Sequence, residues 1–206
     1  LEIKEKIGDI KGKAISLHQV GNIYYFKGDY DEALIQYQKS LEIAEKIGDI
    51  KGVSESLHQV GMIYEDKGDY DEALIQYQKS LEIKEKIGDI KGVSDSLHQV
   101  GNIYYFKGDY DEALIHYQKS LEIKEKIGDI PGLAISMGQM GNLHFQKKEF
   151  DIALEFFIQA FLIFTKIGSP YANQARKDIA RTREKLPEDQ FQAILKKFKL
   201  EPGNFD

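Results

Sequence analysis

The sequence predicts an all-α protein, a solenoid of antiparallel helix pairs, and three observations support this. The amino-acid sequence repeats with a period of 40 residues: residues 1–40, 41–80 and 81–120 are nearly identical, and residues 121–160 are a diverged copy. Each copy holds two stretches of about 18 residues with helical periodicity. A Gly-Asp pair follows each stretch in the first three copies. Such periods are typical of units that bury their apolar faces only against their neighbours.

The second copy shows how one helix pair is encoded. The apolar positions of each stretch share a helical face: Leu57, Val60 and Tyr64 in the first, and Ala73, Leu74, Tyr77 and Leu81 in the second. We therefore expect two helices that pack face to face in each copy, at about residues 10–27 and 30–47 in the first.

The Gly-Asp pairs are expected to end one helix and begin the next. Gly48 and Gly68 suit the left-handed position after a helix. Asp49 and Asp69 suit the N-cap of the following helix, and Glu72 stands at capping-box spacing from Asp69.

These turns also define the predicted boundaries. Four repeats are placed at 9–48, 49–88, 89–128 and 129–168. Residues 1–8 have a sequence that in the other copies ends the second helix of a repeat. We therefore expect them to end the helix of a truncated preceding repeat. Residues 169–200 are predicted to form degenerate, more polar capping helices, with a tail at 201–206.

A set of positions that recurs in each copy resembles a known family. In the second copy they are Leu57, Val60, Gly61, Tyr64, Gly68, Tyr70, Ala73, Tyr77 and Ser80, and together they resemble the tetratricopeptide repeat signature. Gly61 and Ala73 are small, which allows two helices to approach closely. The 40-residue period is similar to the repeats of kinesin light chains, Leu-Gly-Asn-repeat adaptors and sensor arrays of signalling ATPases. The resemblance implies a right-handed superhelix that binds proteins and has no catalytic activity.

Composition and charge narrow the partners. The net charge is −6, and residues 1–160 carry 19 basic against 28 acidic side chains, which argues against nucleic acid. The basic residues of 161–206 are predicted to form a solvated helix face. No apolar run is long enough to span a membrane, and no cysteine is present. The expected compartment is the cytoplasm.

Differences between the copies point to a candidate site. Copies one and two differ at seven positions, including Lys4 against Ala44, and copies one and three at four. Most changes lie on the first helix. Ile15, Asn22, Tyr25 and Phe26 share one face of that helix with His18.

The resemblance implies that this face lines a concave groove for a peptide. The predicted site residues are Ile15, His18, Asn22, Tyr25 and Phe26 in the first row; Glu55, His58, Met62, Glu65 and Asp66 in the second; Asp95, His98, Asn102, Tyr105 and Phe106 in the third; and Ile135, Gly138, Asn142, Phe145 and Gln146 in the fourth. Drift on an unused solvent face is the alternative. Aromatic side chains on a face expected to be wet favour an interface.

The pattern suggests a chemistry for the peptide. Repeats stack about 10 Å apart, so the aromatic pairs of the first and third rows would lie about 20 Å apart. The acidic trio Glu55, Glu65 and Asp66 stands between them. An extended peptide with two apolar anchors about six residues apart and Lys or Arg between them would fit.

Other chemistry is not expected. His18, His58 and His98 recur in register, but neighbours about 10 Å apart cannot share a metal ion. The Gly-Asp-Tyr-Asp-Glu text lacks the ligand spacing of a calcium loop. No catalytic constellation, metal site or cofactor motif is evident, so the chain is not predicted to be an enzyme.

Three alternatives stay open. Leu1, Ile3 and Ile7 could form an end-to-end contact between chains. The segment 195–200, which alternates apolar and basic residues, could occupy the acidic groove of its own or another chain. The array could also be the sensor region of a larger signalling ATPase.

Overall fold

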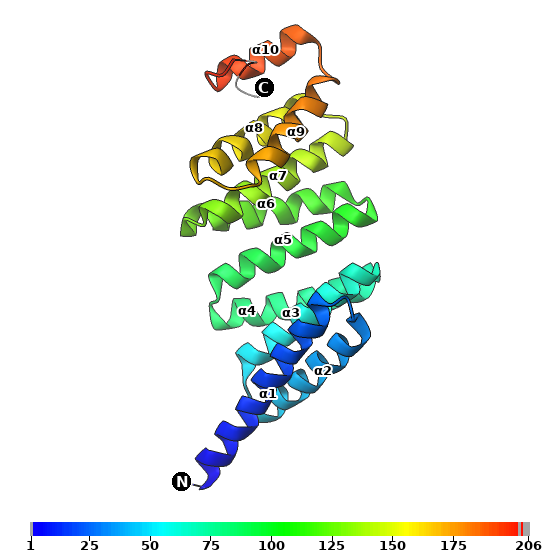
Figure 1. Cartoon of the computed structure of the whole chain (residues 1–206), viewed down its shortest axis with the longest axis vertical. Helices are drawn as coiled ribbons and strands as arrows, with labels where there is room; N and C mark the ends of the chain where they lie inside the picture. The colour runs from blue at the N-terminus through cyan, green and yellow to red at the C-terminus, as the bar shows by residue number, and fades with distance from the viewer. Residues whose placement is uncertain (1, 202, 204–206) are drawn as a thin grey trace. The chain divides into compact units, whose positions relative to one another are not determined.

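The computed structural model describes the backbone of residues 2–201 and 203, and the side chains of residues 10–201 and 203. It divides into two units, residues 1–107 and 108–206, which are described separately. The described residues form helices and no strands, which confirms the all-α fold class (Figure 1). The first unit holds α1 (Glu2–Phe26), α2 (Tyr30–Ile47), α3 (Ile50–Lys67), α4 (Tyr70–Ile87) and α5 (Ile90–Lys107). The second holds α6 (Tyr110–Ile127), α7 (Ile130–Gln146), α8 (Phe150–Lys166), α9 (Ala172–Arg183) and α10 (Glu188–Lys197).

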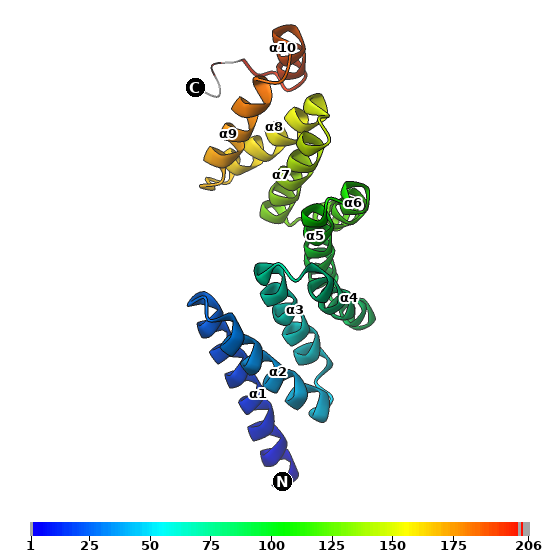
Figure 2. The same cartoon turned by 90° about the vertical axis from the view of Figure 1, so that its right-hand side faces the viewer.

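The helices of the first unit pack as antiparallel pairs. α1 lies along α2 and α3 along α4, while α3 also packs on α2 and α5 on α4 (Figure 2). The helices of each pair meet at a glycine and an aromatic ring. A Cβ atom on Gly61 would lie 2.8 Å from the ring of the fully buried Tyr77, and one on Gly21 would lie 2.7 Å from the ring of Tyr37. The predicted need for a small residue at position 61 is therefore confirmed, and the close neighbour is the tyrosine ring.

The turns between helices form at glycine as predicted. Gly68 has φ +79°, and its N–H donates to the carbonyl of Glu65 (2.9 Å). The N–H of Asp69 donates to the carbonyl of Tyr64 (2.8 Å). These two bonds satisfy carbonyls at the end of α3 and reverse the chain into α4.

The predicted N-caps are only half correct. The Asp49 carboxylate accepts a hydrogen bond from the Gly52 N–H (3.3 Å), but Asp69 makes no side-chain cap bond, so the predicted capping box with Glu72 is wrong. A Cβ on Gly52 would lie 3.1 Å from the Asp49 carboxylate, so glycine leaves room for this cap. The Asp69 N–H, which a capping box would give to Glu72, already donates to the carbonyl of Tyr64.

The beginning of the chain also differs from the prediction. Residues 2–9 continue α1, which runs unbroken from Glu2 to Phe26, and do not end a separate helix before a turn at Gly8. A helix can continue through Gly8 because one glycine costs it only about 1 kcal/mol. At the internal Gly-Asp pairs, the packing between the two joined helices outweighs the continuous helix and favours a turn. The contact predicted at Leu1, Ile3 and Ile7 lies outside the described side chains.

A recurring ion pair joins each second helix to the next first helix. The Asp31 carboxylate pairs with the Lys67 ammonium (2.8 Å), and Asp71 pairs with Lys107 in the same way. In the second unit Asp111 pairs with Lys147 (2.7 Å). The Gly-Asp-Tyr-Asp-Glu text thus supplies both a turn and a contact between repeats.

The second unit ends in helices that cover α8. Ile179 of α9 and Phe191 and Leu195 of α10 are buried in one cluster with Phe157 and Phe161. The Lys197 ammonium also contacts the Glu155 carboxylate (2.5 Å).

This packing contradicts one alternative. Leu195, Phe198 and Leu200 of the segment 195–200 pack in this cluster, so the segment does not occupy the groove of its own chain. Of the predicted tail, residues 202 and 204–206 lie outside the described residues. Within the described part of the chain, no helix combines the length and the apolar character that crossing a membrane would require.

Candidate functional site

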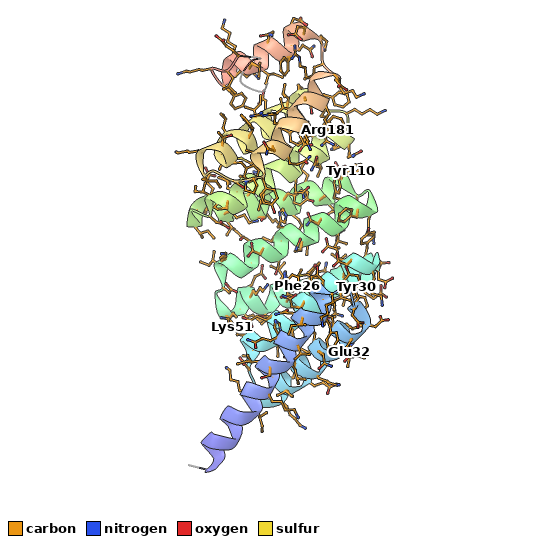
Figure 3. All side chains as sticks on the ribbon, in the orientation of Figure 1. Phe26, Tyr30, Glu32, Lys51, Tyr110 and Arg181 are labelled. Atoms are coloured by element: carbon orange, nitrogen blue, oxygen red, sulfur yellow. The ribbon has the colours of Figure 1, made fainter. Side chains whose placement is uncertain are left out.

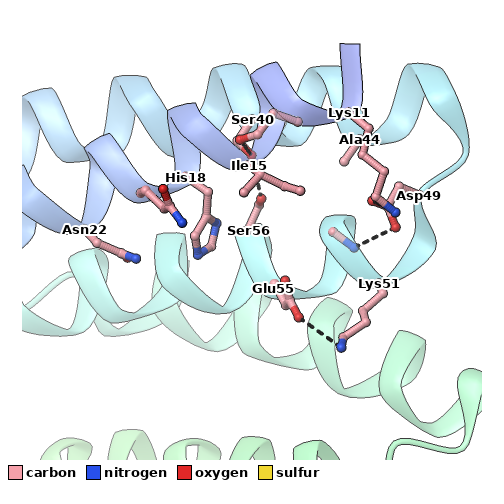
Figure 4. A pocket seen from close by; sticks show the side chains of 13 residues that line it. Lys11, Ile15, His18, Asn22, Ser40, Ala44, Asp49, Lys51, Glu55 and Ser56 are labelled. Atoms are coloured by element: carbon pink, nitrogen blue, oxygen red, sulfur yellow. Dashed lines mark hydrogen bonds and ion pairs between the residues drawn. The ribbon is translucent and has the colours of Figure 1, made fainter. Parts of the chain in front are cut away.

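A cavity of about 410 Å³ lies between α1, α2 and α3, and we call it the α1–α3 cavity (Figure 4). It is lined by Lys11, Ala14, Ile15, His18, Gln19 and Asn22 of α1, Ser40 and Ala44 of α2, and Asp49, Lys51, Gly52, Glu55 and Ser56 at the beginning of α3. Four of these, Ile15, His18, Asn22 and Glu55, are among the predicted site residues. The structure therefore brings together part of the first two predicted rows.

Two polar residues of the cavity, Asn22 and His18, contact the buried Tyr37 of the core. The Tyr37 hydroxyl donates to Oδ1 of Asn22 (2.6 Å), and the His18 ring packs on the Tyr37 ring with centroids 5.2 Å apart. Burial lowers the pKa of His18, and the nearby Glu55 carboxylate opposes this shift. His18 is therefore uncharged at neutral pH and can accept or donate a hydrogen bond.

Charged side chains surround the cavity. The Lys11 ammonium lies 2.9 Å from the Asp49 carboxylate, and the Lys51 ammonium lies 3.7 Å from the Glu55 carboxylate. The hydrogen bond from Lys11 is the main reason that the pKa of Asp49 is lowered. Glu55 is exposed, so its carboxylate is accessible to a partner.

The predicted acidic trio is not available as a unit. The Glu65 carboxylate accepts a hydrogen bond from the Tyr77 hydroxyl (2.6 Å), and burial raises the pKa of Glu65. Burial is the main reason that the pKa of Tyr25 is raised, and its hydrogen bond to the Asp66 carboxylate raises the pKa further. Two of the three carboxylates are thus used within the fold, and Glu55 alone of the trio lines the cavity.

The aromatic residues of the first and third rows are not equally exposed. Tyr25 is half-buried and packs on the cluster of Ala33, Tyr37, Val60 and Ile63, and Tyr105 is half-buried as well. Phe26, at the end of α1, is 84% exposed (Figure 3).

Phe106 has a neighbour across the repeats. Its ring stacks on that of Tyr70 in α4, with centroids 5.7 Å apart, and its other side is exposed. The expectation of a wet aromatic face therefore holds for Phe26 and Phe106 and fails for the two tyrosines.

The remaining residues of rows two and three are half-buried. The His58 ring packs on Tyr77 with centroids 5.2 Å apart, and Met62 packs against the cluster that contains Tyr77. Nδ2 of Asn102 donates to Oε1 of Gln99 (2.6 Å). Asp95 and His98 are also half-buried.

The second unit holds an equivalent cavity of about 340 Å³, the α7–α9 cavity. Its lining residues are Ile135, Gly138, Gln139, Asn142, Phe157, Ala160, Phe164, Tyr171, Gln174, Ala175 and Asp178. Oδ1 of Asn142 accepts a hydrogen bond from Arg181 of α9 (2.5 Å). The Arg181 guanidinium also lies over the ring of Phe145, 4.6 Å from its centroid. Gln146 is exposed and does not line this cavity.

Sequence reasoning missed most of the polar lining of the α1–α3 cavity. Ser40, Ala44 and Ser56 were not predicted as site residues, because helical periodicity does not reveal where a cavity opens. One signal was present: position 44 is alanine where the other copies carry Lys4, Lys84 and Lys124. Among the described residues, no group of three or more His, Cys, Asp or Glu side chains is placed to hold a metal ion.

Comparison with protein families matches the family described as tetratricopeptide repeat over residues 12–86, 52–126 and 92–166. No curated protein matches the chain in sequence.

Several solved structures share the fold. BtubC from P. vanneervenii superposes with a TM-score of 0.75 at 15% identity, covering 97% of this chain and 90% of that one. The nearly identical TPR-like repeats of a putative kinesin light chain from Podosopora anserina give 0.71 at 18% identity, covering 93% and 99%. A signal transduction ATPase with a tetratricopeptide repeat sensor, from Pyrococcus horikoshii, gives 0.80 at 24% identity, covering 91% of this chain and 30% of that one.

Proposed function

Because this chain belongs to the tetratricopeptide repeat family, we propose that it is a non-catalytic protein-binding module whose first helices hold a peptide segment of a partner. The observation that carries the proposal is the α1–α3 cavity, an open space of about 410 Å³ that four predicted site residues line. A concave site with an apolar side chain and a few convergent polar groups is typical of ligand recognition. Its residues bind and orient a segment, and no nucleophile with an adjacent base lies among them.

The lining indicates the chemistry of the segment. Ile15 is an exposed apolar contact beside the accessible carboxylate of Glu55. Exposed aromatic rings at Phe26 and Phe106 offer further apolar contacts. We therefore infer an extended peptide with apolar anchors and a basic residue near Glu55. The acidic charge of residues 1–160 favours such a peptide over nucleic acid. A cytoplasmic adaptor or scaffold would have this activity.

Selection of a random peptide library on the chain tests the proposal. Enriched peptides should bind the double variant Ile15→Asp/Glu55→Lys at least tenfold more weakly, because it removes an apolar contact and reverses a charge. Both side chains are exposed, so the variant should fold. Ile75→Asp is the matched control, since Ile75 is similarly exposed on α4 and lines no part of the cavity. No enrichment, or equal binding by the double variant, would contradict the proposal.

One observation favours self-association as a second candidate. Ile23 of α1 is 54% exposed, whereas the equivalent Ile63 of α3 is fully buried against α2. The face of α1 that includes Ile23 is therefore an exposed apolar face whose equivalent on α3 is a contact between repeats, and such faces favour association. Sedimentation should detect a concentration-dependent dimer that Ile23→Glu abolishes and Ile35→Glu, on α2, does not. A monomer at all concentrations would exclude this candidate.

A further inference from the structure

One position on the second helix decides whether the space between neighbouring repeats is open. Position 44 in the first repeat is alanine, and the equivalent residues of the next two repeats are Lys84 and Lys124. All three are buried. A buried lysine is rare unless its ammonium is paired, so its surroundings show what this position is built to hold.

Lys84 fills the space between α3, α4 and α5. Its side chain is 6% exposed, and its ammonium donates to Oγ of Ser96 (2.9 Å). Burial lowers the pKa of Lys84, and the carboxylates of Asp89, Asp95 and Glu55 oppose this shift.

The contact recurs, and glycine makes room for it. The Lys124 ammonium donates to Oγ of Ser136 (3.2 Å) in the second unit. A Cβ on Gly92 would lie 2.9 Å from Cδ of Lys84, so the glycine leaves space for the lysine chain.

The α1–α3 cavity has the same lining without the lysine. Gly52, Ser56 and Asp49 are the equivalents of Gly92, Ser96 and Asp89, and Glu55 replaces Asp95. Ala44 lacks the four atoms from Cγ to Nζ that Lys84 places there. Oγ of Ser56, which is buried, reaches only Oγ of Ser40, at 3.4 Å, and so keeps acceptor capacity (Figure 4).

Lys11 replaces the missing ammonium only in part. It reaches Asp49 from the solvent side, and its side chain is 52% exposed. Such an exposed pair contributes little and can be exchanged. An incoming ammonium could therefore displace Lys11 into water and contact the same carboxylate.

We propose that the α1–α3 cavity binds a lysine side chain of the partner peptide beside Ala44, in the position that Lys84 and Lys124 occupy in the following repeats. This rests on the proposed function and names the residue that the peptide must carry. Ser56, Asp49 and Glu55 receive the ammonium, and Gly52 and Ala44 flank the methylene chain. Lysine is preferred to arginine, because the position is shaped for a compact ammonium and not for a planar guanidinium.

The first test uses n-propylammonium, which carries the four atoms that alanine lacks. Nuclear magnetic resonance should show saturable shifts at Ala44 and Ser56, at about 10–100 mM for so small a ligand. The variant Ala44→Lys should lose these shifts, because its own side chain fills the cavity. Lys84→Ala should gain equivalent shifts at Ser96. Equal shifts in the chain and in Ala44→Lys, or none, would overturn the proposal.

The second test uses the peptides from the library selection. Replacing their conserved lysine by norleucine should weaken binding at least tenfold, and Ala44→Lys should weaken the unmodified peptides equally. Gln38→Lys is the matched control, since it adds the same charge to an exposed site of α2 outside the cavity. Ala44→Lys should fold, because positions 84 and 124 carry lysine already.

The outcomes separate the two claims. Peptides that bind the chain and Ala44→Lys equally would overturn the lysine position and leave peptide binding intact. A selection that enriches nothing would overturn the proposed function and the peptide lysine together, whatever propylammonium does. Peptides that lose affinity on Ala44→Lys and on the norleucine change, but not on Gln38→Lys, would support both.

Discussion

The α1–α3 cavity and the α7–α9 cavity occupy the same place in two repeats, yet their polar groups are satisfied differently. Asn22 accepts a hydrogen bond from the Tyr37 hydroxyl (2.6 Å). The equivalent ring in the second unit is Phe157, which has no hydroxyl, and Asn142 accepts from Arg181 of α9 instead (2.5 Å). Both repeats have the asparagine, but its hydrogen-bond donor is the buried tyrosine in the first unit and an arginine of α9 in the second.

The two cavities also differ in what fills them. The first has Ala44, Ser40 and Ser56 on its walls, and the equivalents of Ala44 and Ser40 in the second are Phe164 and Ala160. The rings of Tyr37 and Phe157 are nevertheless fully buried, each against a glycine of the first helix. The comparison teaches that the contact between the glycine and the ring of paired helices is the same in both repeats. The side chains that line the space between successive first helices differ.

The largest expected effect tests the constant part. A Cβ on Gly141 would lie 2.6 Å from the Phe157 ring, so Gly141→Val should destabilise the second unit by about 3 kcal/mol through overpacking. Urea unfolding measures the change. Gly138→Ala, one turn earlier in α7, is the matched control, because a Cβ there meets nothing within 4 Å. It should stabilise the helix by about 0.5–1 kcal/mol. Equal effects of the two changes would refute a special contact at Gly141.

The second effect tests the displaced donor. Arg181→Ala removes the hydrogen bond to Asn142 and the contacts of the guanidinium with the rings of Phe145 and Phe157. We expect a loss of about 2.5 kcal/mol in the free energy of unfolding.

A rescue sharpens this second test. Adding Phe157→Tyr to Arg181→Ala should restore about 1 kcal/mol, because the new hydroxyl can donate to Asn142 as Tyr37 donates to Asn22. Phe157→Tyr alone should not stabilise the chain, since Arg181 already satisfies Asn142. A double variant no more stable than Arg181→Ala would show that the two donors are not equivalent.

The repeat made most of the fold predictable from the sequence. Helical periodicity and glycine turns were repeated in register, so each weak local signal was confirmed by its copies. The predictions failed where a second conformation or a second hydrogen-bond partner competes with the local pattern. Gly8 forms no turn, because a continuous helix tolerates one glycine at a cost of about 1 kcal/mol. Asp69 makes no capping box, because its N–H already donates to the carbonyl of Tyr64.

The candidate site was less predictable, for a physical reason. Periodicity shows which face a residue lies on, but not whether its polar atoms are already satisfied there. Glu65 looked like a free carboxylate and is tied to Tyr77. Ala44 stood out only as a difference between copies, and the structure places it in the lining of the α1–α3 cavity.

A smaller effect is a pH dependence of stability that His58 gives to the first unit and that the second unit lacks at the equivalent position. Burial, with a further contribution from the Lys84 charge, lowers the pKa of His58 to about 4. The equivalent residue of the α7–α9 cavity, Gly138, cannot titrate. Because the folded-state pKa lies below the unfolded value near 6.5, the stabilising contribution is present above pH 6.5 and is lost as the pH falls towards 4. Between pH 7 and pH 5 the loss should be about 2 kcal/mol.

The difference between the chain and a His58→Gln variant isolates this contribution from other titrating groups. The free energy of unfolding of the chain should fall more steeply than that of the variant between pH 7 and pH 5. Parallel curves would mean that His58 takes up its proton as easily in the folded chain as in the unfolded one.

The smallest effect concerns the hydroxyl that distinguishes the two rings. Tyr37→Phe makes the first unit like the second but supplies no arginine, so Asn22 loses its donor. Because Asn22 is only half-buried, water can replace the hydroxyl, and we expect a loss of about 1 kcal/mol. Asn22→Leu in the same chain should recover most of that loss, since the pair then leaves no unsatisfied acceptor. A double variant that loses the sum of both single changes would instead mean that Asn22 and Tyr37 stabilise the cavity independently.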